Sequence, residues 1–311
     1  MNYRPELDGL RAISVISVIL YHLGIPHIGA GYAGVDVFFV ISGFLIGGQI
    51  AKDRARGTFT YWNFYARRAL RILPALYLVI ISSIIAGWFT MLPYEFRYFG
   101  GGALSTLLSV SNFWFWDIID YFNPAAALDP LVHTWSLSVE EQFYFFVPLL
   151  FGLLWGFGRK VLFLALLSVA VVSFLITVKT NSDSPMSAFY LLHTRAWELL
   201  VGVLAALKSD KMRSFKSIAP LMSNVGLILT IAGLTLLPYD ALWPGGWTLV
   251  PVTGAMLILL FGKEKSITRT ILKLAPLRFI GLISYSAYLW HQPILSFLGI
   301  KNMLPADGIS L

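Results

Sequence analysis

The sequence predicts an all-α fold, a polytopic transmembrane bundle of about nine to ten helices. Of the 311 residues, 57% are hydrophobic and only 13% are charged, whereas soluble domains are roughly 45–50% apolar and about 25% charged. The mean hydropathy is +0.74. Apolar stretches recur along the whole chain, and many approach the roughly 18–20 residues that a helix needs to cross about 30 Å of hydrocarbon.

The chain reads as one unit. No soluble domain, low-complexity linker or internal repeat interrupts it, so we expect a single transmembrane domain over residues 1–311. The N-terminus lacks a small-residue cleavage site and carries acidic residues before its first apolar run, which favours a retained helix over a signal peptide. The absence of cysteine excludes disulfides and thiolate metal sites.

The expected helices follow the apolar runs in order. They cover about 8–22, 33–50, 69–91, 104–118, 139–157, 160–178, 190–207, 218–237, 247–262 and 280–300. The run 104–118 is short and passes into SNFWFWD, an aromatic sequence typical of the membrane interface. We therefore expect it to be re-entrant or to lie in the interface, with its backbone covered by protein.

The basic residues indicate an orientation. Most of the 23 Lys and Arg lie in 51–71, 159–160, 208–217 and 262–278. Cytoplasmic loops of membrane proteins collect such residues, and all four segments can face the cytoplasm only if 104–118 does not cross. Nine crossings follow, with the N-terminus inside and the C-terminus outside.

The first helix carries two ionisable residues, Arg11 and His22. Such groups inside a membrane cost about 2.5–3.5 kcal/mol each on insertion scales and usually mark a pathway or a site. The two lie roughly 16 Å apart along a helix, so they suit two ends of one cavity. Histidine is a natural general base for a hydroxyl. The alternative is a cytoplasmic anchor and an interfacial histidine.

The segment FYARRALRILPAL, residues 64–76, contains a pair of arginines. Arg68 and Arg71 lie one helical turn apart and present two guanidinium groups on one face, a geometry that suits phosphates. On spacing alone, the basic flank of an ordinary membrane helix explains the pair better.

The segment HTWSLSVEEQFYFF, residues 133–146, places His133, Glu140 and Glu141 before an apolar run. Consecutive residues cannot share a helical face, so at most one of the two glutamates points into a given cavity. The alternative is that the carboxylates stabilise the start of a helix through its dipole.

Further polar residues gather at the expected outer side. Asp36 begins the second helix, and Arg195 and Glu198 form an i,i+3 pair that can neutralise itself inside the bundle. His291 lies in SYSAYLWHQP, residues 284–293, where a lone histidine is more often a packing residue than a catalyst. With the basic segment on the opposite face, these residues suggest a polar path between two faces.

Six stretches in this order resemble the acyltransferase-3 family of integral-membrane acyltransferases, which includes bacterial O-acetyltransferases of surface polysaccharides. They are LDGLRAISVISVILYH (7–22), GYAGVDVFFVISGFLI (31–46), FYARRALRILPAL (64–76), HTWSLSVEEQFYF (133–145), RAWELLVG (195–202) and SYSAYLWHQP (284–293). Together they extend over nearly the whole chain, and as an ordered set they are far more specific than any one of them.

The resemblance implies an enzyme of the bacterial cytoplasmic membrane. It would take an acyl group, in the first place acetyl, from cytoplasmic acyl-CoA and pass it to a hydroxyl of a carbohydrate or cell-surface glycan on the outer side. No metal and no nucleic acid are implied. In the family an Arg-x10-His pair and an Arg-x-x-Arg motif are functional, which are Arg11 with His22 and Arg68 with Arg71 here. The first glutamate of VEE, Glu140, is the more consistent position.

Combining both lines gives a hypothesis for the site. His22 is the general base, and Glu140 or Asp36 orients its imidazole. The acyl-CoA is bound by arginines, namely Arg11 along the route of its pantetheine arm and Arg67, Arg68 and Arg71 at its phosphates. Acceptor-binding or supporting residues are His133, Trp135, Arg195, Glu198, Ser284, Tyr285 and His291. Direct transfer and an acyl-enzyme, including an acyl-histidine, both stay open.

The end of the chain departs from the family. Members usually have another helix after the LWHQP-like stretch, and some carry an SGNH-type domain; we expect this chain to lack both. A different class of function also fits buried Arg, Glu and His in a helical bundle, namely a transporter or flippase. A transporter binds its substrate without breaking a bond, whereas an acyltransferase cleaves acyl-CoA and fails when Arg68 or Arg71 is lost. A catalytically idle sensor or assembly partner is a third reading.

Overall fold

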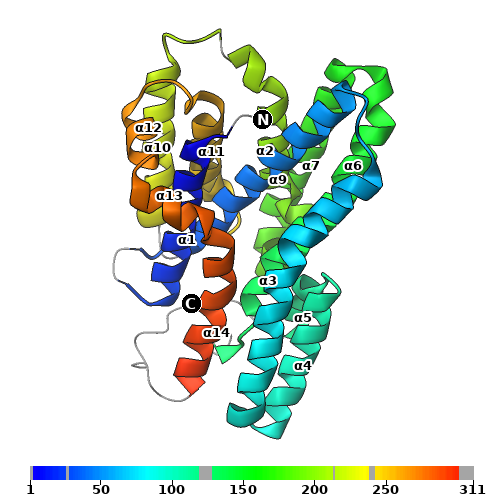
Figure 1. Cartoon of the computed structure of the whole chain (residues 1–311), viewed down its shortest axis with the longest axis vertical. Coiled ribbons are helices and arrows are strands. Elements are labelled where there is room, and N and C mark those ends of the chain that lie inside the picture. Colours follow the sequence, from blue (N-terminus) through cyan, green and yellow to red (C-terminus); the bar gives the residue numbers. More distant parts are fainter. Residues whose placement is uncertain (1–2, 26–27, 119–127, 213, 238–241, 301–311) are drawn as a thin grey trace.

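The computed structural model describes residues 3–25, 28–118, 128–212, 214–237 and 242–300 (Figure 1). Every regular element in these ranges is helical, which confirms the all-α prediction. The helices are α1 Pro5–His22, α2 Gly34–Ala55, α3 Tyr61–Thr90, α4 Pro93–Leu107, α5 Ser111–Ile118, α6 Trp135–Leu154, α7 Arg159–Asp183, α8 Pro185–Tyr190, α9 Leu192–Met212, α10 Ala219–Thr235, α11 Leu249–Phe261, α12 Ile267–Leu272, α13 Ala275–Leu282 and α14 Ser284–Ile300. Short 3₁₀ turns at Gly31–Ala33, Val132–Thr134, Trp155–Phe157 and Gly246–Thr248 precede or follow longer helices.

Several helices can cross a bilayer by length and composition. Among the described residues, five uninterrupted helical segments satisfy both criteria: Gly31–Ala55, Tyr61–Thr90, Val132–Phe157, Arg159–Asp183 and Pro185–Ser209. Two shorter helical segments, Ala219–Thr235 and Gly246–Phe261, are also apolar. The chain is therefore an integral membrane protein, and the expected nine crossings stay a prediction.

The predicted helix 104–118 is two helices. Helix α4 begins early because Pro93 occupies its first turn and the Glu95 carboxylate accepts a hydrogen bond from the Leu92 amide (2.8 Å). It ends at Leu107, and the chain turns through Ser109, which has a left-handed φ of 57°. Helices α4 and α5 lie side by side beside one end of α3 (Figure 1). A helical hairpin thus replaces the single segment, and its depth in a membrane stays a prediction.

Two other boundaries move in ways that matter for the site. Helix α3 begins at Tyr61 rather than 69, because the Thr60 hydroxyl caps it by accepting from the Asn63 amide (3.3 Å). The arginines of RRALR therefore lie on a helix. The predicted helix 280–300 is divided at Ile283 into α13 and α14.

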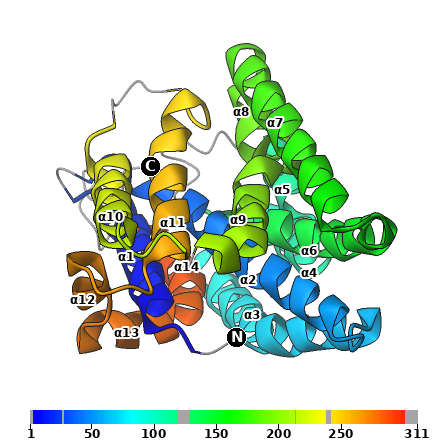
Figure 2. The same cartoon turned by 90° about the horizontal axis from the view of Figure 1, so that it is seen from above.

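Helix α2 lies inside the bundle and packs closely on α9 (Figure 2). A side chain on Gly43 would overlap the carbonyl of Leu199, and one on Gly202 would overlap the carbonyl of Val40. Such small residues let membrane helices approach backbone to backbone. This contact fixes α2, which also packs against α1, α6 and α11.

The contact can be tested with two glycine substitutions. We expect Gly202→Ala to destabilise the protein by about 1–3 kcal/mol, because the new methyl group must displace the α2 backbone. Gly100→Ala is the matched control, since Gly100 lies in α4 facing open space and alanine favours a helix by roughly 0.5–1 kcal/mol. Thermal unfolding in detergent measures both; equal midpoints for the two variants would contradict the close contact.

Candidate active site

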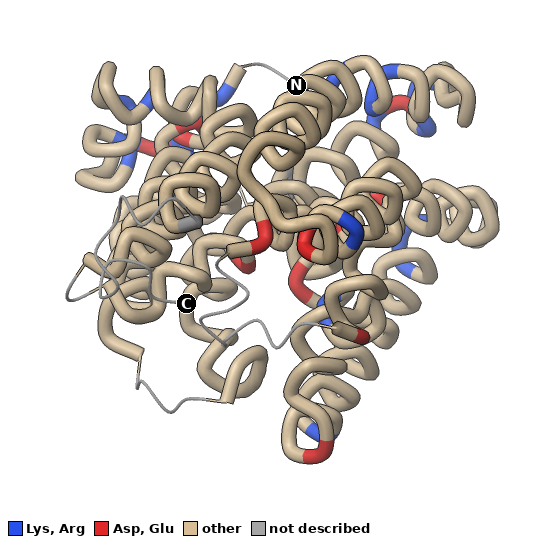
Figure 3. The backbone as a smooth tube through the Cα atoms, turned by 90° about the horizontal axis from the view of Figure 1, so that it is seen from below, with Lys and Arg blue, Asp and Glu red and all other residues tan. Residues whose placement is uncertain are grey.

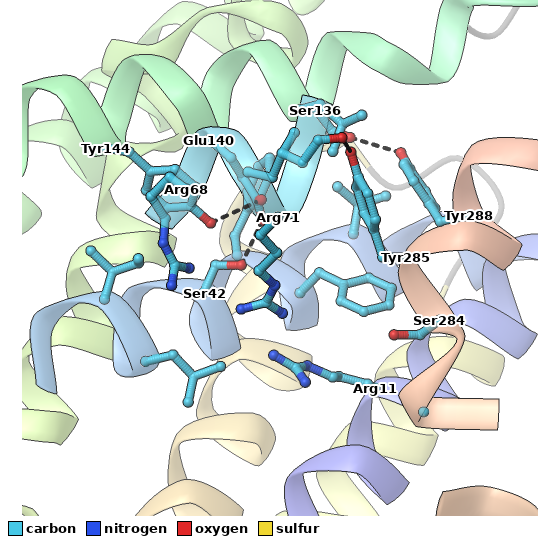
Figure 4. A pocket seen from close by; sticks show the side chains of 18 of the residues that line it. Arg11, Ser42, Arg68, Arg71, Ser136, Glu140, Tyr144, Ser284, Tyr285 and Tyr288 are labelled. Atoms are coloured by element: carbon cyan, nitrogen blue, oxygen red, sulfur yellow. Dashed lines mark hydrogen bonds between the residues drawn. The ribbon is translucent and has the colours of Figure 1, made fainter. Parts of the chain in front are cut away.

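A cavity of about 130 Å³ opens between α1, α2, α3, α6 and α14 (Figure 4). Three of its lining residues are arginines, Arg11 from α1 and Arg68 and Arg71 from α3. Arg68 and Arg71 share a face because they are three residues apart on one helix. The prediction that this pair presents two guanidinium groups on one face is confirmed, and α1 supplies a third.

The arginines differ in their partners. Arg11 lies 3.5 Å from the Asp8 carboxylate on its own helix, and its side chain is 19% exposed. Arg67, although adjacent to Arg68, turns away from the cavity and pairs with Asp53 (3.2 Å) with half of its side chain exposed. Arg67 therefore does not line the cavity with Arg68 and Arg71, and its role at the phosphates of acyl-CoA stays a prediction.

A single carboxylate faces the arginines in the described part of the cavity wall, that of Glu140. It accepts hydrogen bonds from the Ser42 hydroxyl (2.7 Å) and the Tyr144 hydroxyl (3.1 Å) (Figure 4). Glu141 does not line the cavity, as expected for neighbouring residues on a helix. The cavity thus combines three guanidinium groups with one carboxyl group.

The start of α14 forms another wall of the same cavity. Ser284, Tyr285 and Tyr288 all line it, and the acceptor-binding or supporting role of the first two stays a prediction. The Tyr285 hydroxyl donates to the carbonyl of Ile72 on α3 (3.0 Å). The hydrogen bond ties α14 to the helix that carries the arginine pair.

Ser136 and Tyr288 connect the cavity to a second polar centre. Their hydroxyls lie 2.7 Å apart, and the Tyr288 hydroxyl also donates to the carbonyl of His133 (3.0 Å). Both residues line the cavity on one side and adjoin His133 on the other. The arginine cavity therefore leads to His133.

The second centre is a cluster of three histidines, His22, His133 and His291. The ring of His291 lies 5.1 Å from that of His22 and 5.3 Å from that of His133. Each comes from a different part of the chain: the end of α1, the turn before α6, and the middle of α14. All three side chains are buried.

The histidine cluster differs from the hypothesis in how His22 is held. Its Nδ1 lies 2.8 Å from the carbonyl of Val18, one turn earlier in α1. A carbonyl only accepts, so Nδ1 carries the hydrogen and Nε2 has the lone pair that a general base needs. A backbone carbonyl thus holds the nitrogen that Glu140 or Asp36 was expected to orient.

Asp36 belongs to a separate buried ion cluster. The Arg195 guanidinium donates to the carboxylates of Asp36 (2.7 Å) and Glu198 (3.0 Å) and to the carbonyl of Phe189 (2.9 Å). The expected Arg195–Glu198 pair is confirmed, and Asp36 from α2 joins it. The guanidinium also lies 5.4 Å from the centre of the Trp135 ring. Figure 3 shows several acidic positions near the middle of the bundle, whereas most basic positions lie toward its rim.

Sequence reasoning missed the hydroxyl groups of the site. Ser42, Tyr144, Ser136 and Tyr288 carry hydrogen bonds in or beside the cavity. In the sequence, each of these residues is a polar position within an apolar helix. Spacing alone does not show whether such a hydroxyl faces a cavity or bonds a carbonyl of its own helix. Among the described residues, no group of three or more acidic or histidine side chains is suited to hold a metal ion.

Residues 4–304 match the family model described as an acyltransferase domain. The chain belongs to this family. The match confirms the resemblance carried by the six sequence stretches. The family's arginine pair lies in the cavity, and its Arg-x10-His residues lie in the cavity and in the histidine cluster, respectively.

Curated relatives match across nearly the whole chain. It is 33% identical to the putative peptidoglycan O-acetyltransferase YrhL of Bacillus subtilis, over 94% of this chain and 49% of that protein. It is 32% identical to the peptidoglycan O-acetyltransferase OatA of Listeria monocytogenes, over 95% of this chain and 50% of that protein. It is 31% identical to the O-acetyltransferase OatA of Staphylococcus aureus, over 98% of this chain and 53% of that protein. The chain thus spans about half the length of these relatives. No solved structure shows a significant match.

The buried ion cluster predicts that two arginine substitutions change the free energy of unfolding by unequal amounts. Arg195→Ala leaves two buried carboxylates without their shared cation, so we expect a loss of about 3–5 kcal/mol in the free energy of unfolding. Arg67→Ala removes a half-exposed pair and should cost at most about 1 kcal/mol. Denaturation of both variants in the same detergent measures the difference. A loss for Arg195→Ala as small as that for Arg67→Ala would rule out a structural role of the cluster.

Proposed function

We propose that this chain is a membrane-embedded O-acyltransferase. It moves an acyl group, in the first place acetyl, from cytoplasmic acyl-CoA to a hydroxyl of a carbohydrate on the outer side of the bacterial cytoplasmic membrane. Residues 1–311 act as one transmembrane acyltransferase domain with the N-terminus in the cytoplasm. The observation that carries the proposal is the link from the arginine cavity through Ser136 and Tyr288 to the histidine cluster.

The arginine cavity supports acyl-CoA as the donor. Guanidinium groups bind phosphates through paired, charge-assisted hydrogen bonds, and Arg11, Arg68 and Arg71 converge on one opening. With the phosphates there, the pantetheine arm extends past Glu140 and Tyr285 toward Ser136. Arg11 and His22 are roughly 16 Å apart along α1, a span that an extended pantetheine arm can cover.

The histidine cluster supports the chemical step. The Nε2 of His22 takes the proton of the acceptor hydroxyl while the oxygen attacks the thioester carbonyl. The carbon–sulfur bond then breaks, the ester forms, and the thiolate of CoA receives the proton from His22. General-base assistance of this kind is worth about 10²–10⁴-fold in rate.

The acceptor class is proposed from the relatives. Two of them carry peptidoglycan O-acetyltransferase in their names, so a glycan of the cell envelope is the acceptor class that we propose here. A sugar hydroxyl also suits His22 as a general base. Its Nδ1 is bonded to a carbonyl of its own helix, so the lone pair on Nε2 is the one that can accept the hydroxyl proton.

The proposal predicts different defects for substitutions in the histidine cluster and in the arginine cavity. In nanodiscs with acetyl-CoA and soluble peptidoglycan fragments, we expect His22→Ala to bind acetyl-CoA normally but to lose at least about 10²-fold in transfer. Arg68→Ala should weaken acetyl-CoA binding instead. Arg159→Ala is the control, because Arg159 begins α7 outside the cavity. Binding is measured by calorimetry and turnover by release of the CoA thiol.

Two results would count against the proposal. If the folded wild-type protein binds no acyl-CoA, the donor is wrong. If it binds peptidoglycan fragments and carries them across a vesicle membrane without releasing thiol from acetyl-CoA, the transporter alternative replaces the enzyme.

A further inference from the structure

His291 lies beside the proposed base but has no task in the proposed reaction. It occupies the middle of α14, its ring is 5.1 Å from that of His22, and only 7% of the residue is exposed. A histidine that merely fills space in such a position normally satisfies both ring nitrogens, because a buried polar atom without a partner costs about 1–3 kcal/mol.

The ring nitrogens of His291 are in different situations. Nδ1 is hydrogen-bonded to the carbonyl of Tyr288, one turn earlier in α14. Since a carbonyl cannot donate, Nδ1 carries the hydrogen and Nε2 is an acceptor. In the part of the chain that the structure describes, this Nε2 is buried and has no hydrogen-bond partner.

His22 repeats this arrangement from the neighbouring helix. Its Nδ1 is also bonded to a carbonyl of its own helix, that of Val18. Two imidazoles in contact are thus both fixed in the tautomer in which Nε2 accepts. His22 in this tautomer cannot supply the hydrogen that His291 Nε2 lacks, so the donor must come from a bound ligand.

We propose that His291 Nε2 accepts a hydrogen bond from a second hydroxyl of the acceptor, adjacent to the hydroxyl that His22 deprotonates. The site then selects acceptors with neighbouring hydroxyls, as on a sugar ring, over simple alcohols. The inference rests on the proposed function and adds to it the feature by which the acceptor is recognised. A site built to bond a hydroxyl discriminates strongly against analogues that lack it, because its own polar atom is left unpaired.

The test uses a methyl glycoside of N-acetylglucosamine and its monodeoxy analogues as acceptors, with acetyl-CoA as donor. For the wild type, the analogue without the reacting hydroxyl should give no product. A second analogue, without the neighbouring hydroxyl, should show a KM about 10-fold above that of the parent sugar. Release of the CoA thiol without acceptor is followed in parallel to show that the protein is folded and loaded.

The informative variant is His291→Asn. The asparagine amide can still donate to the Tyr288 carbonyl in place of Nδ1, whereas the Nε2 acceptor is lost. We expect its KM for the parent sugar to rise about 10-fold, with no further rise for the second analogue. His291→Gln, whose amide oxygen lies near the position of Nε2, should recover part of the discrimination. Ser296 lies on the same helix as His291 and donates to the Leu128 carbonyl, so Ser296→Ala also loses a hydrogen bond but should keep all of the discrimination.

The outcomes separate this inference from the proposed function. If His291→Asn discriminates between the parent sugar and the second analogue as well as the wild type does, His291 reads no hydroxyl and the inference is overturned while the enzyme stands. If the wild type acylates simple alcohols as readily as the sugar, the inference also fails. If the wild type releases no thiol with any acceptor, both fail together.

Discussion

The close approach of α2 and α9 is the constraint on which the rest of the structure depends. Gly43 and Gly202 bring the two backbones into contact, and at one end of that contact Arg195 of α9 is bonded to Asp36 of α2. Packing of small residues alone does not fix how two membrane helices slide along each other, whereas a buried ion pair has a single good position. The two interactions together set the height of α2 in the bundle.

The position of α2 along α9 determines where Ser42 meets the wall of the arginine cavity. Ser42 follows Asp36 by six residues on α2 and meets Glu140 of α6 at the arginine cavity. Arg195 also holds the Phe189 carbonyl and lies against Trp135, the first residue of α6. The ion cluster therefore aligns α2, α6 and α9, and its residues position the walls of the candidate site without lining the cavity themselves.

The sequence predicted the class of fold, and which polar side chains share one helix, better than it predicted the contacts between helices. Arg68 with Arg71 and Arg195 with Glu198 were predictable because both pairs lie within one turn of a helix. The meeting of His22, His133 and His291 was not, since it depends on the packing of three segments distant in sequence. For the same reason Asp36 was assigned to His22 rather than to Arg195. The division of 104–118 depended on a local turn at Ser109, a residue with no strong preference for that conformation.

The hydrogen-bonded hydroxyls of Ser136 and Tyr288 have a consequence for the membrane itself. A polar route from one face to the other, if filled by a continuous column of water, would let ions and protons leak, driven by about 2.3 kcal/mol per elementary charge for each 100 mV of membrane potential. Ser136, Tyr288 and His133 are almost fully buried where the two polar centres meet. In the proposed function, the arm of the donor would cross at this buried junction, and the side chains that fill it would keep the bilayer electrically sealed.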